Sequence, residues 1–233
     1  MPDSRQRLIV ALDVSSAAVA RKIVTAVGDS ARIYKVGAQL YTAEGPAIVR
    51  ELIGSGFEVF LDLKYHDIPN SVGAAVSEAA KLGVRMLTVH ASGGTKMLRA
   101  AVEAARNTNP STMILGVTVL TSLDDRDLEN GGVRGTVVDQ VIRLGTIALR
   151  AGCHGVVASA QEASALRTDL GDDFVIVTPG VRPLGAGLGD QARVVTPAEA
   201  VAAGANYIVV GRPITEAAEP GAEAREILAE IRS

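Results

Sequence analysis

Residues 58–71 read EVFLDLKYHDIPNS, and this stretch decides how the rest of the chain is interpreted. An apolar run ends in the charged residues Asp62 and Lys64, and Asp67 follows where Pro69 signals a loop. Because a β-strand points successive side chains to opposite faces, Asp62 and Lys64 share one face. Charges directed into a site at a strand end are costly unless they pair or take part in chemistry. The stretch therefore predicts a functional site at the end of a strand.

Apolar runs of this kind alternate with Ala-rich segments of helical periodicity along the whole chain, at intervals of about 25–30 residues. Strands that are buried on both faces and alternate with helices predict a parallel sheet. Eight such units predict one (β/α)8 TIM barrel over residues 1–233. The alternative is an open doubly wound sheet, which is disfavoured because no G-x-G-x-x-G follows the first run. The expected strands are LIVALDV (8–14), RIYKVG (32–37), EVFLDLK (58–64), RMLTVHA (85–91), MILGVTVL (113–120), HGVVAS (154–159), FVIVTPG (174–180) and YIVVGR (207–212).

The composition limits the classes of ligand and the location of the protein. Aromatic residues make up 3% and the net charge is -3, which argues against nucleic-acid binding and favours a small molecule. Cys153 is the single cysteine, so we expect no intrachain disulfide, no cysteine-based zinc site and a reducing cytoplasm. The N-terminal run reads as a strand rather than a signal peptide. No run approaches the ~18 apolar residues of a membrane span, so no membrane association is expected.

Polar residues collect at the predicted strand ends, where barrels place their active sites. Four of them and the nearby Asp67 alternate in sign in the order Asp13, Lys35, Asp62, Lys64 and Asp67, and a structural ion network is one explanation. Because buried ion pairs add little net stability, chemistry is the better explanation. The strand-end residues are Asp13, Lys35, Asp62 with Lys64, His90, Thr121 with Ser122, Ser159, Pro179 with Gly180, and Gly211 with Arg212.

Two features predict a phosphate site near the last strands. Barrels often bind phosphate after strands seven and eight, where Gly211 offers backbone and Arg212 offers charge-assisted hydrogen bonds. The alternative is that Arg212 is a surface arginine. The glycine-rich segment PLGAGLGDQARV predicts a mobile loop at about residues 182–193 that closes over a ligand, rather than a plain surface loop. No motif predicts a tight metal site or a covalent nucleophile.

The chain closely resembles the bacterial-type orotidine 5′-phosphate decarboxylase family, nearly from end to end. The matching motifs are ALDV, KVG, DLKYHDIPNSV, VHASGG, VTVLTS, VTPGVR, GDQARV and IVVGRPIT. The resemblance implies cofactor-independent decarboxylation of orotidine 5′-monophosphate to UMP and CO2, the last step of de novo pyrimidine nucleotide synthesis. A related group of metal-dependent sugar-phosphate decarboxylases and synthases shares D-x-K-x-x-D, but has an acidic residue where this chain has Lys35.

The resemblance also implies a role for each matched residue. Lys64 would donate the proton and Asp62 would face the substrate carboxylate. Asp67, Ile68 and Ser71 would complete the neighbour's site in a homodimer; Ser71 stands where Thr is frequent, and it keeps the hydroxyl. Lys35 would belong to the catalytic charge array with Asp62, Lys64 and Asp67. The remaining substrate contacts would be Asp13 and again Lys35 at the ribose, Thr121 and Ser122 at the pyrimidine, Gln191 and Arg212 at the phosphate with Arg182 and the Gly211 backbone assisting, and Pro179 beside them.

Three other functions stay open at this point. The first is a metal-dependent sugar-phosphate lyase of the related group, which EDTA would inhibit. The second is a barrel that binds nucleotide without catalysis. The third is a Schiff-base aldolase, which is disfavoured because the carboxylates near Lys35 and Lys64 favour ammonium groups over the free amine that forms the Schiff base.

Overall fold

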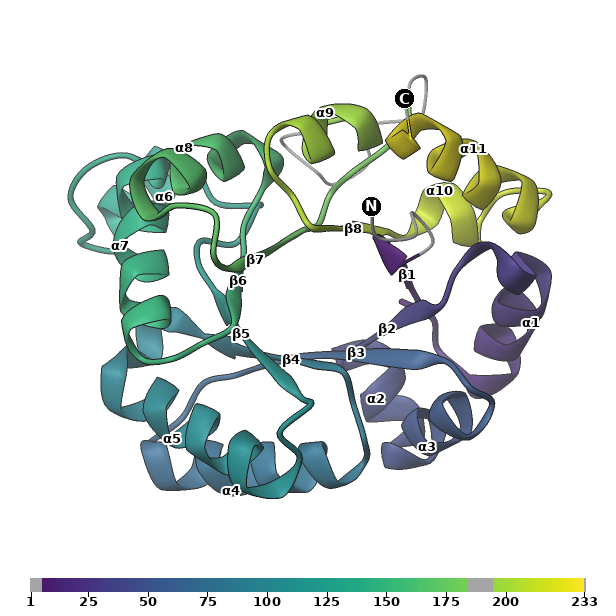
Figure 1. The fold of residues 1–233 in the computed structure, drawn as a ribbon, viewed down its shortest axis with the longest axis horizontal. Coiled ribbons are helices and arrows are strands. Elements are labelled where there is room, and N and C mark those ends of the chain that lie inside the picture. The colour runs from purple at the N-terminus through teal and green to yellow at the C-terminus, as the bar shows by residue number, and fades with distance from the viewer. Residues whose placement is uncertain (1–5, 184–194, 233) are drawn as a thin grey trace.

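The computed structural model describes residues 6–183 and 195–232 of the chain. Its strands are all parallel and form a closed barrel in which β8 pairs with β1 (Figure 1). This confirms the predicted (β/α)8 barrel, and the open doubly wound sheet is wrong. The strands are β1 (Leu8–Ala11), β2 (Ile33–Gly37), β3 (Glu58–Tyr65), β4 (Met86–His90), β5 (Met113–Val117), β6 (Gly155–Val157), β7 (Val175–Thr178) and β8 (Tyr207–Val210).

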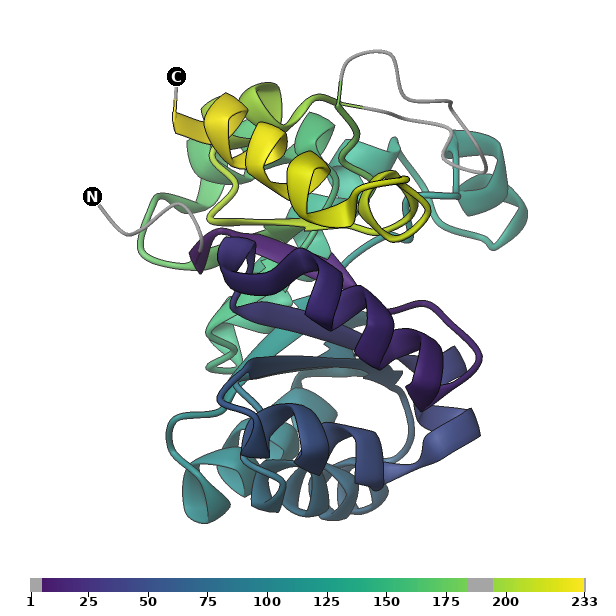
Figure 2. The same cartoon turned by 90° about the vertical axis from the view of Figure 1, so that its right-hand side faces the viewer.

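Helices surround the barrel on all sides (Figure 1). The first and last long helices, α1 and α11, lie side by side on its outer surface (Figure 2). Within the described ranges, no helix is long and apolar enough to cross a membrane. The helices are α1 (Ala17–Val27), α2 (Ala38–Glu44), α3 (Pro46–Gly54), α4 (Pro69–Lys81), α5 (Gly94–Thr108), α6 (Asp125–Asn130), α7 (Val137–Arg150), α8 (Ala160–Leu170), α9 (Pro197–Ala202), α10 (Arg212–Thr215) and α11 (Pro220–Arg232), with short 3₁₀ turns η2 (Gly28–Ser30) and η3 (Ala91–Gly93).

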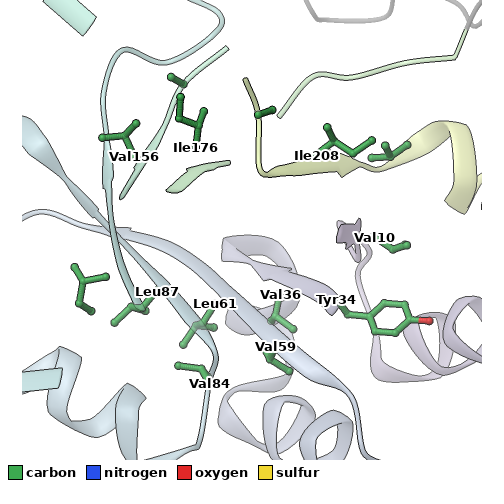
Figure 3. Close-up of a cluster of buried hydrophobic side chains, with 14 of the residues drawn as sticks. Val10, Tyr34, Val36, Val59, Leu61, Val84, Leu87, Val156, Ile176 and Ile208 are labelled. Atoms are coloured by element: carbon green, nitrogen blue, oxygen red, sulfur yellow. The ribbon is translucent and has the colours of Figure 1, made fainter. Parts of the chain in front are cut away.

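The alternation of side chains along each strand divides the core into two shells. In β1, Ile9 and Ala11 point into the barrel, whereas Leu8 and Val10 point outward to the helices. Figure 3 shows part of the outer shell, which includes Tyr34 and Leu61. The inner shell contains Ile9, Ala11, Ile33, Phe60, Met86, Leu115, Val177 and Val209. Because this inner shell fills the barrel, a ligand can bind only at its mouth.

Several strands end earlier than their apolar runs. β5 ends at Val117, although the run continues to Leu120, because Val119 and Leu120 line a cavity instead of pairing with a neighbouring strand. Ser159, expected at a strand end, begins α8, where its side chain and that of Glu162 form a capping box. Ser159 thus serves the helix and not the barrel mouth. Most of the loop expected at about 182–193, including Gln191, lies outside the described residues.

Candidate active site

A cavity of about 720 Å³ opens at the C-terminal ends of the strands. One wall comes from β1, β2 and β3, and a second wall comes from the segments that follow β7 and β8. Residues far apart in the sequence therefore share one pocket. Of the residues predicted from the sequence, Asp13, Lys35, Asp62, Lys64, Thr121, Pro179, Arg182, Gly211 and Arg212 line it.

The first wall carries an unbroken chain of alternating charges. Lys35 Nζ lies 2.7 Å from Asp13 Oδ1 and 3.7 Å from Asp62 Oδ2. Lys64 Nζ donates to the same Asp62 Oδ2 at 2.8 Å. Asp62 therefore faces two ammonium groups, and its side chain is only 11% exposed. Close ion pairs at such burial are costly to assemble, which favours a functional over a stabilising role for them.

The strand register explains why these side chains meet. Ala11 pairs with Lys35, and Gly37 pairs with Asp62, so the polar layer lies directly above the apolar inner shell. Gly37 leaves room for this layer. A Cβ atom at residue 37 would lie 2.9 Å from both Asp13 Oδ1 and Lys35 Nζ. A side chain at residue 37 would therefore displace the Asp13 carboxylate or the Lys35 ammonium, and this role of the KVG glycine was not predicted from the sequence.

Lys64 lies at an irregularity in β3. Leu61 pairs with Leu87 and Tyr65 pairs with Val89, so three residues of β3 are opposite Thr88 alone. Lys64 has φ 50°, and it is the one non-glycine residue with positive φ in the described ranges. A lysine rarely adopts this conformation, and such strain is concentrated at functional sites. The bulge brings the side chains of Asp62 and Lys64 to the same cavity.

Asp67, Ile68 and Ser71 lie away from the cavity of their own chain. All three are exposed beyond the end of β3 and at the start of α4. Asp67 accepts a hydrogen bond from the Ile68 amide at 2.6 Å, and in the described part of the chain it forms no ion pair. Ile68 is 66% exposed. One chain therefore does not bring Asp67 to Lys64.

The second wall presents cations and backbone groups. Gly180, with φ 76°, and the buried Arg182 follow β7, and Gly211 with Arg212 begins α10 after β8. Pro179 belongs to the same wall. Thr121, in the segment that follows β5, also lines the cavity, whereas Ser122 is exposed and does not. The wall is suited to an anion, because guanidinium groups and backbone N–H groups both bind phosphate oxygens.

Two groups of residues at the site were not anticipated. Val19, Lys22 and Ile23 of α1 line the cavity, because α1 packs beside its mouth. Nothing in a helical pattern alone indicates which turn will reach a neighbouring pocket. Thr88 was also missed, although it lies two residues before His90 on the inward face of β4, where a polar residue in a buried strand is a usable signal.

His90 ends β4 beside the charged chain, and its ring lies 5.3 Å from that of His66. Burial, with smaller contributions from the charges of His66 and Lys64, lowers the pKa of His90, while Asp62 opposes the shift. The environment of His90 at the edge of the site therefore favours the neutral form of its imidazole over the charged form.

A lowered pKa makes His90 a source of acid sensitivity. Because the unfolded chain binds a proton at His90 more readily, the free energy of unfolding should fall as the pH drops below about 6.5. His90→Gln removes this contribution, so its free energy of unfolding should fall less over the same range. Urea unfolding of wild-type protein and of His90→Gln at pH 8 and pH 5.5 measures the fall in the free energy of unfolding for each. An equal fall in the two proteins would contradict the assignment.

Other reactive groups are less suited to chemistry. Burial raises the pKa of Cys153 to about 12, so its thiol does not supply a thiolate near neutral pH. Within residues 6–183 and 195–232, no three His, Cys, Asp or Glu side chains cluster in a way that could hold a metal ion.

Known proteins match this chain along almost its whole length. Residues 6–227 match the family described as Orotidine 5'-phosphate decarboxylase / HUMPS family. Orotidine 5'-phosphate decarboxylase of Halorhodospira halophila is 51% identical, over 97% of this chain and 95% of the relative. The enzyme of the same name from Heliobacterium modesticaldum is 49% identical, over 98% of this chain and 97% of the relative. The crystal structure of the Lactobacillus acidophilus enzyme superimposes with a TM-score of 0.88 at 37% identity, covering 98% of this chain and 100% of that one. The chain belongs to the orotidine 5'-phosphate decarboxylase / HUMPS family.

Proposed function

We propose that this protein decarboxylates orotidine 5′-monophosphate to UMP and CO2, the last step of de novo pyrimidine nucleotide synthesis, as a cytoplasmic homodimer without a cofactor. Relatives of 48–51% identity that bear this enzyme's name support the reaction. One observation carries the proposal. The chain Asp13–Lys35–Asp62–Lys64 forms one wall of a cavity that Arg182 and Arg212 also line.

The two walls orient the substrate. Its phosphate binds at Arg212, Arg182 and the Gly211 backbone, and its ribose hydroxyls bind at Asp13 and Lys35. The pyrimidine then lies near Thr121, with its carboxylate beside Asp62. A nucleotide held at both ends has already lost the translational and rotational freedom that it would otherwise lose on reaching the transition state. This loss of freedom on binding is a large part of what positioning contributes to catalysis.

The reaction then needs one proton from the protein. The bond between the ring carbon and the carboxylate breaks, CO2 leaves, and the electron pair stays on the ring carbon. Lys64 Nζ, which bears protons and lies 2.8 Å from Asp62, stabilises this charge and donates a proton to the same carbon. UMP is formed, and solvent returns a proton to Lys64.

Repulsion of the substrate carboxylate by Asp62 is too small to explain such catalysis. Two like charges about 4 Å apart at an effective dielectric constant of about 20 repel by about 4 kcal/mol. Enzymes typically lower barriers by about 8–23 kcal/mol. Most of the effect must therefore come from interactions of Lys64 that strengthen in the transition state, and from the binding energy of the phosphate.

The neighbouring subunit completes the site in this proposal. Asp67, Ile68 and Ser71 are exposed and do not line their own cavity, and Ile68 is a large apolar side chain in water. A twofold dimer would bury Ile68 and bring Asp67 to the partner's Lys64. Lys64 would then lie between two carboxylates, Asp62 of its own chain and Asp67 of the other.

A metal-dependent lyase is less consistent with the site. Lys35 Nζ lies 2.7 Å from Asp13 and 3.7 Å from Asp62, so a side-chain ammonium already neutralises both carboxylates. A direct assay tests the proposed function. Purified protein incubated with orotidine 5′-monophosphate should release CO2 and UMP in equal amounts, whereas a non-catalytic binding protein would release neither.

Arg212→Ala tests the phosphate site. We expect kcat/KM for orotidine 5′-monophosphate to fall about 10- to 100-fold, which is the effect of losing one or two charge-assisted hydrogen bonds. The kcat/KM for orotidine, which lacks the phosphate, should change little. Arg21→Ala is the control, because Arg21 is exposed on α1 and pairs with Glu51. A parallel loss with both substrates would show that Arg212 does not act on the phosphate.

A further inference from the structure

Thr88 is completely buried in β4 and does not line the cavity, yet its hydroxyl contacts both the backbone of Lys64 and the side chain of Asp62. Its Oγ1 accepts a hydrogen bond from the Lys64 amide at 2.9 Å. The same hydroxyl donates to Asp62 Oδ1 at 3.0 Å. Because the hydroxyl has a single proton, the two bonds have one direction, from the Lys64 amide to Thr88 and from Thr88 to Asp62.

The first bond supports an unfavourable backbone. In the β3 bulge, residues 62–64 are opposite Thr88 alone, so the ladder gives the Lys64 amide no regular partner in β4. The Thr88 hydroxyl takes the place of that partner. It fixes the backbone of Lys64 at φ 50°, an unfavourable conformation that persists only where its surroundings hold it.

The second bond orients a carboxylate. With Oδ1 held by Thr88, Asp62 presents Oδ2 to Lys64 Nζ at 2.8 Å and to Lys35 Nζ at 3.7 Å. Rotation of the Asp62 carboxylate would change both of these distances. One buried hydroxyl therefore holds the backbone that carries Lys64 and the carboxylate that binds its ammonium.

We propose that Thr88 is a positioning residue for catalysis, which sets where Lys64 Nζ stands relative to the reacting carbon. This inference rests on the proposed decarboxylase function. Thr88→Val, which keeps the shape and removes the hydroxyl, should lower kcat about 10- to 100-fold, as displacements of about 1 Å do. KM should change less than about threefold, because the phosphate and ribose contacts remain. Thr88→Ser keeps both bonds and should restore kcat to within about threefold of wild type.

Thr112→Val is the matched control. Thr112 is also buried, and its hydroxyl donates one hydrogen bond to the Val84 carbonyl, away from the cavity. Its loss should lower thermal stability without lowering kcat. If Thr88→Val and Thr112→Val lose similar stability and both keep wild-type kcat, Thr88 is merely structural and the proposal is overturned. Should Thr88→Val not fold, Thr88→Cys replaces it, because a thiol is a weak donor and acceptor and differs from Thr88→Ser by one atom.

A second readout does not depend on activity. In wild-type protein, the hydrogen bond to Thr88 should protect the Lys64 amide from hydrogen exchange. In Thr88→Val this amide should exchange at least about tenfold faster, which is the effect of losing one hydrogen bond. Unchanged protection would overturn the positioning role. If wild-type protein does not decarboxylate orotidine 5′-monophosphate but the exchange result holds, the proposed function fails while the role of Thr88 in the wall stands.

Discussion

Lys64→Ala should lower kcat for orotidine 5′-monophosphate by at least about 10³-fold, because it removes the proton donor and the cation nearest the developing charge. The effect should appear mainly in kcat, since Lys64 acts on the transition state more than on the bound substrate. Steady-state kinetics, with thermal unfolding to show that the variant is folded, measure this.

Lys81→Ala is the control for loss of a lysine charge. Lys81 is exposed on α4 and pairs with Glu78, so its removal should leave kcat unchanged. A folded Lys64→Ala protein with near-wild-type turnover would end the assignment of Lys64 as the proton donor.

A heterodimer of Lys64→Ala and Asp67→Asn subunits should recover about half of wild-type activity, although each variant alone is expected to be nearly inactive. In a twofold dimer with shared sites, one site collects both substitutions and the other collects neither. Differently tagged subunits, coexpressed and purified through both tags, provide the heterodimer.

The control heterodimer combines Lys64→Ala with Asp62→Asn. Both residues line the cavity of their own chain, so each site of this heterodimer carries one substitution and activity should stay low. Recovery in the first heterodimer alone supports a shared site. Failure of the first heterodimer to recover activity would contradict the contribution of Asp67 to the neighbour's site.

The barrel could be predicted from the sequence because its periodicity is strong. Every second side chain of a parallel strand points into the barrel, and all the strands end at the same edge of the sheet. Asp13, Lys35 and Asp62, at the ends of three strands, were therefore placed together at that edge. The ends of the runs were less predictable. Val119 is apolar like a strand residue, but it lines the cavity wall. Apolar character alone does not distinguish a residue of a buried strand from a residue that lines a cavity.

The bulge at Lys64 could not be predicted, because it depends on how β3 and β4 pair and not on either sequence alone. The α1 residues Val19 and Lys22 were missed for the same reason: tertiary packing brings them to the site. Thr88 was missed although a polar residue on the inward face of a buried strand was a usable signal. Asp67 presents the opposite case. Its place in the motif indicates chemistry, but within one chain it is exposed and away from the cavity, so its partner can be tested only in the assembled protein.

If the Asp13–Lys35–Asp62–Lys64 chain decarboxylates orotidine 5′-monophosphate without a metal ion, activity should survive the removal of divalent cations. The loss of orotate-ring absorbance can be followed with protein that has been treated exhaustively with EDTA and dialysed. We expect turnover equal to that of untreated protein. Absence of turnover in both samples, or turnover that EDTA abolishes and added divalent metal restores, would contradict it.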